Sequence, residues 1–192
     1  DVAVVGRFAG DTALAAVGSC VALVGIFVNL NVGLAVGPNA VLATVIGQNK
    51  RKRINPMIHT IITFGIIMGI LLMITGMLLA RIVLEASGTP ASVMDEALLY
   101  IRIYFLSIPF MVTYNFGSAI LRSYGDTKRP MYYLMITGVV NIILNLILVI
   151  VFSLGVAGVA IATLIANILS ASLVLIHLYR RTRTKVDKQL YE

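Results

Sequence analysis

The sequence is poor in charge. Asp, Glu, Lys and Arg make up 12% of its 192 residues, tryptophan is missing, and there is one cysteine. A soluble domain carries about 25% charged residues. The residues that fill the chain instead are apolar: 59% are hydrophobic, and the mean hydropathy is +0.98. This composition excludes an ordinary soluble domain and indicates an integral membrane protein.

The scarcity of cysteine and histidine limits the chemistry that the chain can perform. Cys20 has no partner for an intrachain disulfide, so we expect it to be a small packing residue. His59 and His177 have no His, Cys or paired acid at ligand spacing, so neither predicts a metal site. A nucleophile elbow and a phosphate loop are also missing from the sequence. An enzyme is therefore the least favoured class.

Long apolar stretches occupy most of the chain. Each reaches the ~20 residues that a helix needs to cross a bilayer. Backbone groups in hydrocarbon must bond to each other, and the alternation typical of a membrane barrel is absent, so the stretches are predicted to be helices. The sequence therefore predicts an all-α polytopic bundle whose membrane helices span residues 13–47, 57–84, 98–121, 131–153 and 156–179.

The basic residues predict how the helices are oriented. The net charge is +7, but the basic residues are not clustered with stacking aromatics, so no nucleic-acid partner is expected. If the five spans alternate, only Arg7, Arg81 and Arg102 lie on one side. The positive-inside rule then places segments 49–54, 122–130 and 180–188 in the cytoplasm of a cell (inner) membrane protein. These segments hold Lys50, Arg51, Lys52, Arg53, Arg122, Lys128, Arg129, Arg180, Arg181, Arg183, Lys185 and Lys188.

Glycine, proline and capping residues mark the predicted helix ends. Gly and Pro in segment 85–97 indicate an outer loop, and Ser92 is expected to cap the next helix, with acids in its first turn. Asp126 is expected to cap the short turn before Pro130. Pro38 is expected to kink the long first span.

Small and polar residues form stripes on the predicted helices. Gly25, Asn29, Gly33 and Gly37 recur every four residues, which favours a packing surface. Pore lining by Asn29 and Asn31 is the alternative. A third-span stripe of polar and flexible residues predicts a side that faces the bundle interior or a watery cavity, and it contains Ser107, Met111, Asn115, Ser118 and Arg122.

The last two spans carry polar stripes that could face each other. Amides at this depth need partners, so the two stripes could hydrogen-bond across the helices or form a hydrated ion or proton site. One stripe contains Thr137, Asn141 and Asn145, and the other contains Thr163, Asn167 and Ser170. The candidate cavity-lining residues of the whole chain are Asn29, Asn31, Asn115 and Asn167.

Several short motifs, taken in order, cover nearly the whole chain. The opening segment 1–18, the glycines of segment 33–47, the Gly-Asp-Thr-Lys-Arg-Pro sequence at 125–130, and segments 141–145 and 154–163 are the pieces concerned. Together they resemble the multidrug and toxin extrusion (MATE) family of transporters.

The resemblance implies a twelve-helix exporter built from two six-helix lobes. Residues 1–182 would be the N-terminal lobe without most of its first helix, and residues 183–192 a basic cytoplasmic linker toward a missing C-terminal lobe. Substrates would be drugs or organic cations, expelled in exchange for H⁺ or Na⁺ without another cofactor. The other partners would be membrane lipid and the missing lobe.

The resemblance also assigns a coupling site. Asp1 falls on the family's first-helix carboxylate, and Asn141, Asn145 and Thr163 fall on polar positions around it. Some relatives have Asp where this chain has Asn145, which leaves the choice between H⁺ and Na⁺ open. Burial favours the neutral carboxyl, so Asp1 could load and release a proton. We hypothesise that protonation lets the first helix bend against the last two spans.

Two other functions stay open. A lipid-linked oligosaccharide flippase of the same superfamily would be expected to place more basic residues in its cavity. A structural membrane subunit would use the same polar stripes only for assembly. We expect the isolated fragment to be incompetent for transport unless it dimerises.

Overall fold

A computed structural model of the chain describes residues 2–189, with every side chain among them except those of Arg51 and residues 182–189. Within this range the ordered segments are all helical. They are α1 (Val2–Phe8), α2 (Asp11–Gly47), α3 (Arg51–Ala86), α4 (Met94–Ser123), α5 (Lys128–Leu146), the π-helix η1 (Ile147–Val151) and α6 (Gly155–Gln189).

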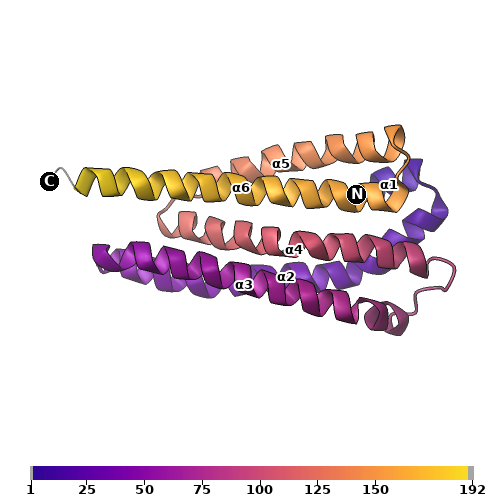
Figure 1. Cartoon of the computed structure of the whole chain (residues 1–192), viewed down its shortest axis with the longest axis horizontal. Helices are drawn as coiled ribbons and strands as arrows, with labels where there is room; N and C mark the ends of the chain where they lie inside the picture. Colours follow the sequence, from indigo (N-terminus) through magenta and orange to yellow (C-terminus); the bar gives the residue numbers. More distant parts are fainter. Residues whose placement is uncertain (1, 190–192) are drawn as a thin grey trace.

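The long helices lie side by side in a bundle and alternate in direction (Figure 1). The α2–α3 turn, the α4–α5 turn and the C-terminal end of α6 share one end of the bundle, on the left of Figure 1. Helix α1 and the other two connections lie at the opposite end. Because the basic segments flank these shared turns, the structure confirms that they gather at one end.

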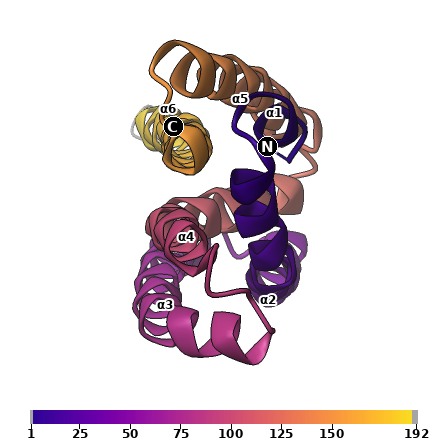
Figure 2. The same cartoon turned by 90° about the vertical axis from the view of Figure 1, so that its right-hand side faces the viewer.

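Helix α4 is the centre of the bundle. Figure 2, an end-on view, shows α4 between α3 and α6, and α4 also contacts α2 and α5. In its most apolar stretch, 61% of the residues of α4 are buried, against 17% for the span that contains α5. Helix α5 therefore packs mainly on α6, and most of its surface has no contact within the described part of the chain.

Five helices are long and apolar enough to cross a membrane, as the sequence predicts. Their ends differ from the predicted spans. Helix α3 begins at Arg51 rather than at 57, and α6 runs on through Gln189 rather than ending at 179. Hydropathy marks the hydrocarbon layer, whereas polar residues can continue the same helix into water. Residues 183–189 of the expected linker are accordingly helical.

Two predicted helix ends can be compared with the structure directly. The expected cap at Ser92 is wrong: α4 begins at Met94, Val93 occupies the capping position, and no side chain bonds there. The acids Asp95 and Glu96 do lie in the first turn. Asp126 does bond within the turn before Pro130, because its Oδ1 accepts the backbone N–H of Arg129 at 3.2 Å, although Thr127 occupies the cap position of α5.

Glycines of α3 let α4 pack closely against it. A Cβ added at Gly69 would lie 2.7 Å from the Cα of Pro109, and one at Gly76 would lie 2.8 Å from the ring of Phe105. Glycine is required at these positions because helix backbones approach this closely only where no side chain intervenes. Gly65 has the same role against α4.

The glycine stripe of α2 behaves differently. A Cβ at Gly25, Gly33 or Gly37 would meet nothing within 4 Å, so this face packs on nothing within the chain. Cys20, on another face of α2, is fully buried, and its Sγ lies 3.5 Å from the carbonyl of Ala97 on α4. The structure thus confirms the packing role expected of this cysteine.

Candidate functional site

The candidate site is a line of polar side chains between α5 and α6, which we call the polar seam (Thr137, Asn141, Asn145, Thr163 and Ser170). At one end of it, the Ser170 hydroxyl lies 2.9 Å from Thr137 Oγ1. Both residues are buried, and each hydroxyl also bonds to a carbonyl of its own helix. The facing stripes therefore meet as the sequence predicts.

The other end of the polar seam is built from amides. The amide nitrogen of Asn145 donates to Asn141 Oδ1 at 3.2 Å, and the amide nitrogen of Asn141 lies 3.5 Å from Thr163 Oγ1. Asn145 is 1% exposed, whereas Asn141 and Thr163 are half-buried. The structure therefore joins three of the four residues assigned to the coupling site. The fourth, Asp1, lies outside the described residues.

A π-helix follows directly after this amide pair. Helix α5 ends at Leu146 and continues as η1 over Ile147–Val151, where the N–H of Phe152 bonds to the carbonyl of Ile147 at 3.2 Å. Such wide turns are rare and often occur at functional sites. The sequence did not reveal it, because the residues Ile-Leu-Val-Ile-Val fit an α-helix equally well.

Neighbouring backbones hold η1 in place. A Cβ on Gly158 of α6 would lie 3.2 Å from the backbone of Leu148, so α6 approaches the wide turn closely. The short helix α1 contacts both η1 and α6. The first helix of the chain therefore packs on the two elements that border the amide end of the polar seam.

The other predicted cavity-lining residues are dispersed. Asn29 is exposed, and its amide bonds to the carbonyl of Gly25 on its own helix at 2.9 Å. Asn31 is fully buried, and neither polar atom of its side chain has a hydrogen-bond partner. Asn115 and Asn167 are half-buried on α4 and α6. These four residues lie on three different helices, α2, α4 and α6.

The bundle interior carries no formal charge among the described residues. Its buried polar side chains are all amides or hydroxyls. Likewise, no group of three His, Cys, Asp or Glu residues that could hold a metal ion occurs in this part of the chain. Amide and hydroxyl oxygens can accept a hydrogen bond from a protonated group or coordinate a hard cation. They carry no negative charge that would balance the charge of the ion.

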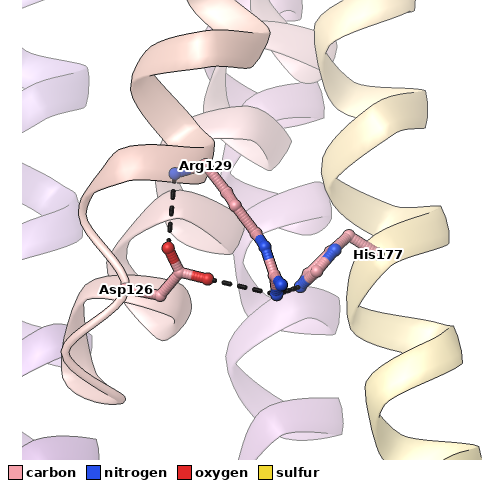
Figure 3. Close-up of polar contacts among 3 residues, drawn as sticks. All are labelled: Asp126, Arg129 and His177. Carbon is pink, nitrogen blue, oxygen red and sulfur yellow. Dashed lines mark hydrogen bonds and ion pairs between the residues drawn. The ribbon is translucent and has the colours of Figure 1, made fainter.

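A second polar group lies at the basic end of the bundle, where Figure 3 shows Asp126, Arg129 and His177 in contact. The Asp126 carboxylate forms an ion pair with Arg129 at 3.3 Å, and the same guanidinium lies 3.0 Å from His177 Nε2. The sequence does not indicate this contact, because Arg129 and His177 lie 48 residues apart and share no motif.

The bundle and its seam define a polytopic membrane protein, and comparison with known sequences narrows the class. The family model MatE matches residues 1–147. A probable multidrug resistance protein of Bacillus subtilis, YoeA, is 31% identical over 181 residues, which are 92% of this chain and 39% of that protein. The chain belongs to the MatE family, and it spans about two fifths of the length of this relative.

Further similarity extends to other transporters. The FAD transporter of Shewanella oneidensis is 24% identical over 85% of this chain and 37% of its own length. The solved inward-facing structure of a multidrug resistance MATE family transporter superimposes with a TM-score of 0.83 at 25% identity, covering 91% of this chain and 39% of that one. The fold of the chain is therefore that of part of a MATE transporter.

Proposed function

We propose that this chain forms the N-terminal lobe of a secondary transporter that exports drugs or organic cations in exchange for H⁺ or Na⁺. The observation that carries the proposal is the polar seam: it is partly buried, its side chains are in contact across α5 and α6, and a π-helix that α1 contacts borders it. The family supports the same activity. The open glycine face of α2 is available to a second lobe, and the basic end of the bundle faces the cytoplasm.

The proposed coupling depends on Asp1, which precedes α1. The negative charge of a carboxylate near an uncharged amide cluster is compensated when it binds a proton or a cation. The charge is uncompensated again after the ion is released. Neutralisation of Asp1 lets α1 move against η1 and α6. Because the two positions of α1 differ in stability with and without the ion, ion binding is coupled to the shape of the drug cavity.

The test is ethidium efflux from cells that express the complete protein containing this chain. The proton gradient and the sodium gradient are collapsed separately. Loss of efflux on collapse of one gradient is the expected result and identifies the coupling ion. Persistent absence of efflux under every gradient would contradict export and favour a flippase or a structural subunit.

The coupling role of Asp1 has its own test. We expect Asp1→Asn to abolish coupled efflux while membrane insertion stays intact, because the amide cannot change its charge. Asp11→Asn is the matched control: Asp11 is exposed in the first turn of α2, and its replacement should leave efflux near the wild-type rate. Efflux retained by Asp1→Asn would exclude Asp1 as the coupling group.

A flippase is the second candidate. A superfamily transporter from Pyrococcus furiosus has a binding pocket of reversed polarity that suggests a different function, so a similar fold does not fix the substrate. That structure superimposes with a TM-score of 0.82 at 26% identity, over 88% of this chain and 38% of that one. Phosphate-bearing substrates call for cavity Lys or Arg. Among the residues whose side chains the structure describes, no Lys or Arg is buried, which disfavours the flippase.

A further inference from the structure

The basic end of the bundle contains a hollow that the proposed transport does not use. It opens onto the surface of the bundle and has a volume of about 580 Å³. Residues of the α4–α5 turn and the start of α5 form most of it, and one residue of α6 completes it. The lining residues are Tyr124, Gly125, Asp126, Thr127, Lys128, Arg129, Tyr132 and Arg181.

Basic side chains outnumber acidic ones in this hollow, and contacts with neighbouring residues hold two of them in place. Arg129 is held between Asp126 and His177 (Figure 3), and this pairing uses the only acid of the lining. Arg181 stacks on Tyr124, with its guanidinium carbon 4.0 Å from the ring centroid. Burial raises the pKa of the Tyr124 phenol, so the ring stays neutral beneath the cation. Three basic groups therefore converge with one acid between them.

The tight turn shapes the hollow. Gly125 has a φ of +79°, a conformation that other residues adopt with strain, and it lets the chain reverse between α4 and α5. The reversal brings Tyr124 and Lys128 to the same side as Arg181. Tyr114 fastens the other side of the turn through a 2.6 Å bond from its hydroxyl to the carbonyl of Pro130.

One side of the hollow borders an exposed apolar face of α5. Tyr132 belongs to the lining and is 53% exposed. The exposed apolar residues of the next turns continue along the same helix, and they are Met131, Leu134, Met135, Ile136 and Val139. Aromatic residues are enriched at the level of lipid headgroups, and basic pockets between membrane helices bind anionic headgroups.

We propose that this hollow binds the phosphate of an anionic phospholipid headgroup. Arg181 and Lys128 bind the phosphate oxygens, because guanidinium and ammonium groups form charge-assisted hydrogen bonds with phosphate. Arg129, held by Asp126 and His177, lines one side of the site. The acyl chains lie along the exposed face of α5. This binding does not depend on which substrate the protein transports.

A second basic hollow serves as an internal comparison. It measures about 490 Å³ and is lined by Asn49, Lys50, Lys52 and Arg53, which are nearly consecutive residues. It has as many cations as the first hollow but no aromatic residue in its lining. If positive charge alone recruited lipid, the two hollows would bind it equally.

The experiment is native mass spectrometry of the purified complete protein in detergent, titrated with dioleoyl-phosphatidylglycerol or dioleoyl-phosphatidylcholine. We expect Arg181→Gln to weaken the first phosphatidylglycerol site about tenfold, as loss of one charged hydrogen-bonding partner does. The matched control Arg53→Gln should change this affinity less than about twofold. Phosphatidylcholine binding should be the same in all variants.

Two further arms make the outcome decisive. Lys128→Gln, at an exposed position, replaces Arg181→Gln if thermal unfolding shows that the latter is misfolded. Millimolar inorganic phosphate is added as a competitor and should leave the bound lipid in place. Displacement by inorganic phosphate would show a site for soluble phosphate and overturn the lipid assignment. Equal weakening by Arg53→Gln, or none by either variant of the hollow, would also overturn it.

Discussion

The two interfaces on either side of the bundle are built in opposite ways. Between α3 and α4, glycines let the backbones approach, and aromatic and proline residues fill the space. Between α5 and α6, hydroxyl and amide side chains bond across a more open contact. Close packing has one good geometry, whereas a hydrogen-bonded seam can exchange partners. The difference assigns rigidity to the α3–α4 side and adjustment to the α5–α6 side.

The largest expected effect is on the packed side. Gly69→Ala should lower the free energy of unfolding by about 1–3 kcal/mol, because its Cβ would lie 2.7 Å from backbone of Pro109. Gly138→Ala, on an exposed part of α5 where nothing lies within 4 Å, should be neutral or stabilising by up to about 1 kcal/mol. Thermal unfolding in detergent can be followed by dye labelling of the buried Cys20 thiol. Equal shifts in both variants would contradict the difference between the faces.

A buried amide outside the polar seam should respond in the opposite direction. Asn31→Leu is expected to raise the free energy of unfolding by about 1 kcal/mol, since both polar atoms of Asn31 are buried without a hydrogen-bond partner. The same unfolding assay measures it. A clear loss of stability would mean that Asn31 bonds to a group outside this chain.

Replacement of the central amide of the polar seam should cost less stability than the glycine change. Asn141→Leu removes the contact with Thr163 across the two helices, and an interhelical hydrogen bond in a membrane contributes on average about 0.6 kcal/mol. It also removes the acceptor that the buried Asn145 amide uses within α5. We expect a loss of about 1 kcal/mol in the unfolding assay. Asn29→Leu is the control, because Asn29 is exposed and bonds only to its own helix. A loss above that of Gly69→Ala would reverse the ranking.

The smallest effect is expected at the hydroxyl end of the polar seam. Thr137→Val keeps the shape of the side chain and removes its bond with Ser170, for a loss of about 0.6 kcal/mol. Ser170 keeps its bond to the carbonyl of Ala166, so no buried group is left without a partner. An effect several times larger would show that the two ends of the seam are energetically coupled.

Hydropathy and spacing predicted the features that depend on burial. The five spans follow from apolar length, and the contact between Thr137 and Ser170 follows from polar residues that recur on two helices. The helix ends at Arg51 and Gln189 were not predictable, because residues outside the hydrocarbon do not need to be apolar.

Other features depend on geometry that the sequence encodes weakly. The packing glycines Gly65 and Gly69 form a small-xxx-small pattern, from which their close contact with α4 could have been predicted. The similar pattern on α2 was predicted to pack instead, but that face is open in the structure. The π-helix has no residue signature, and the contact of Arg129 with His177 joins distant segments. The role assigned to Asp1 stays a prediction, since it lies outside the described residues.

The central claim is that the polar seam, rather than the packed interface, carries ion coupling. Its most direct test is ethidium efflux by Asn141→Leu and Gly69→Ala in the complete protein, each normalised to the amount of folded protein in the membrane. We expect Asn141→Leu to lose gradient-driven efflux despite its modest effect on stability, whereas Gly69→Ala should keep the wild-type rate per folded molecule. Normal efflux by Asn141→Leu would contradict the claim.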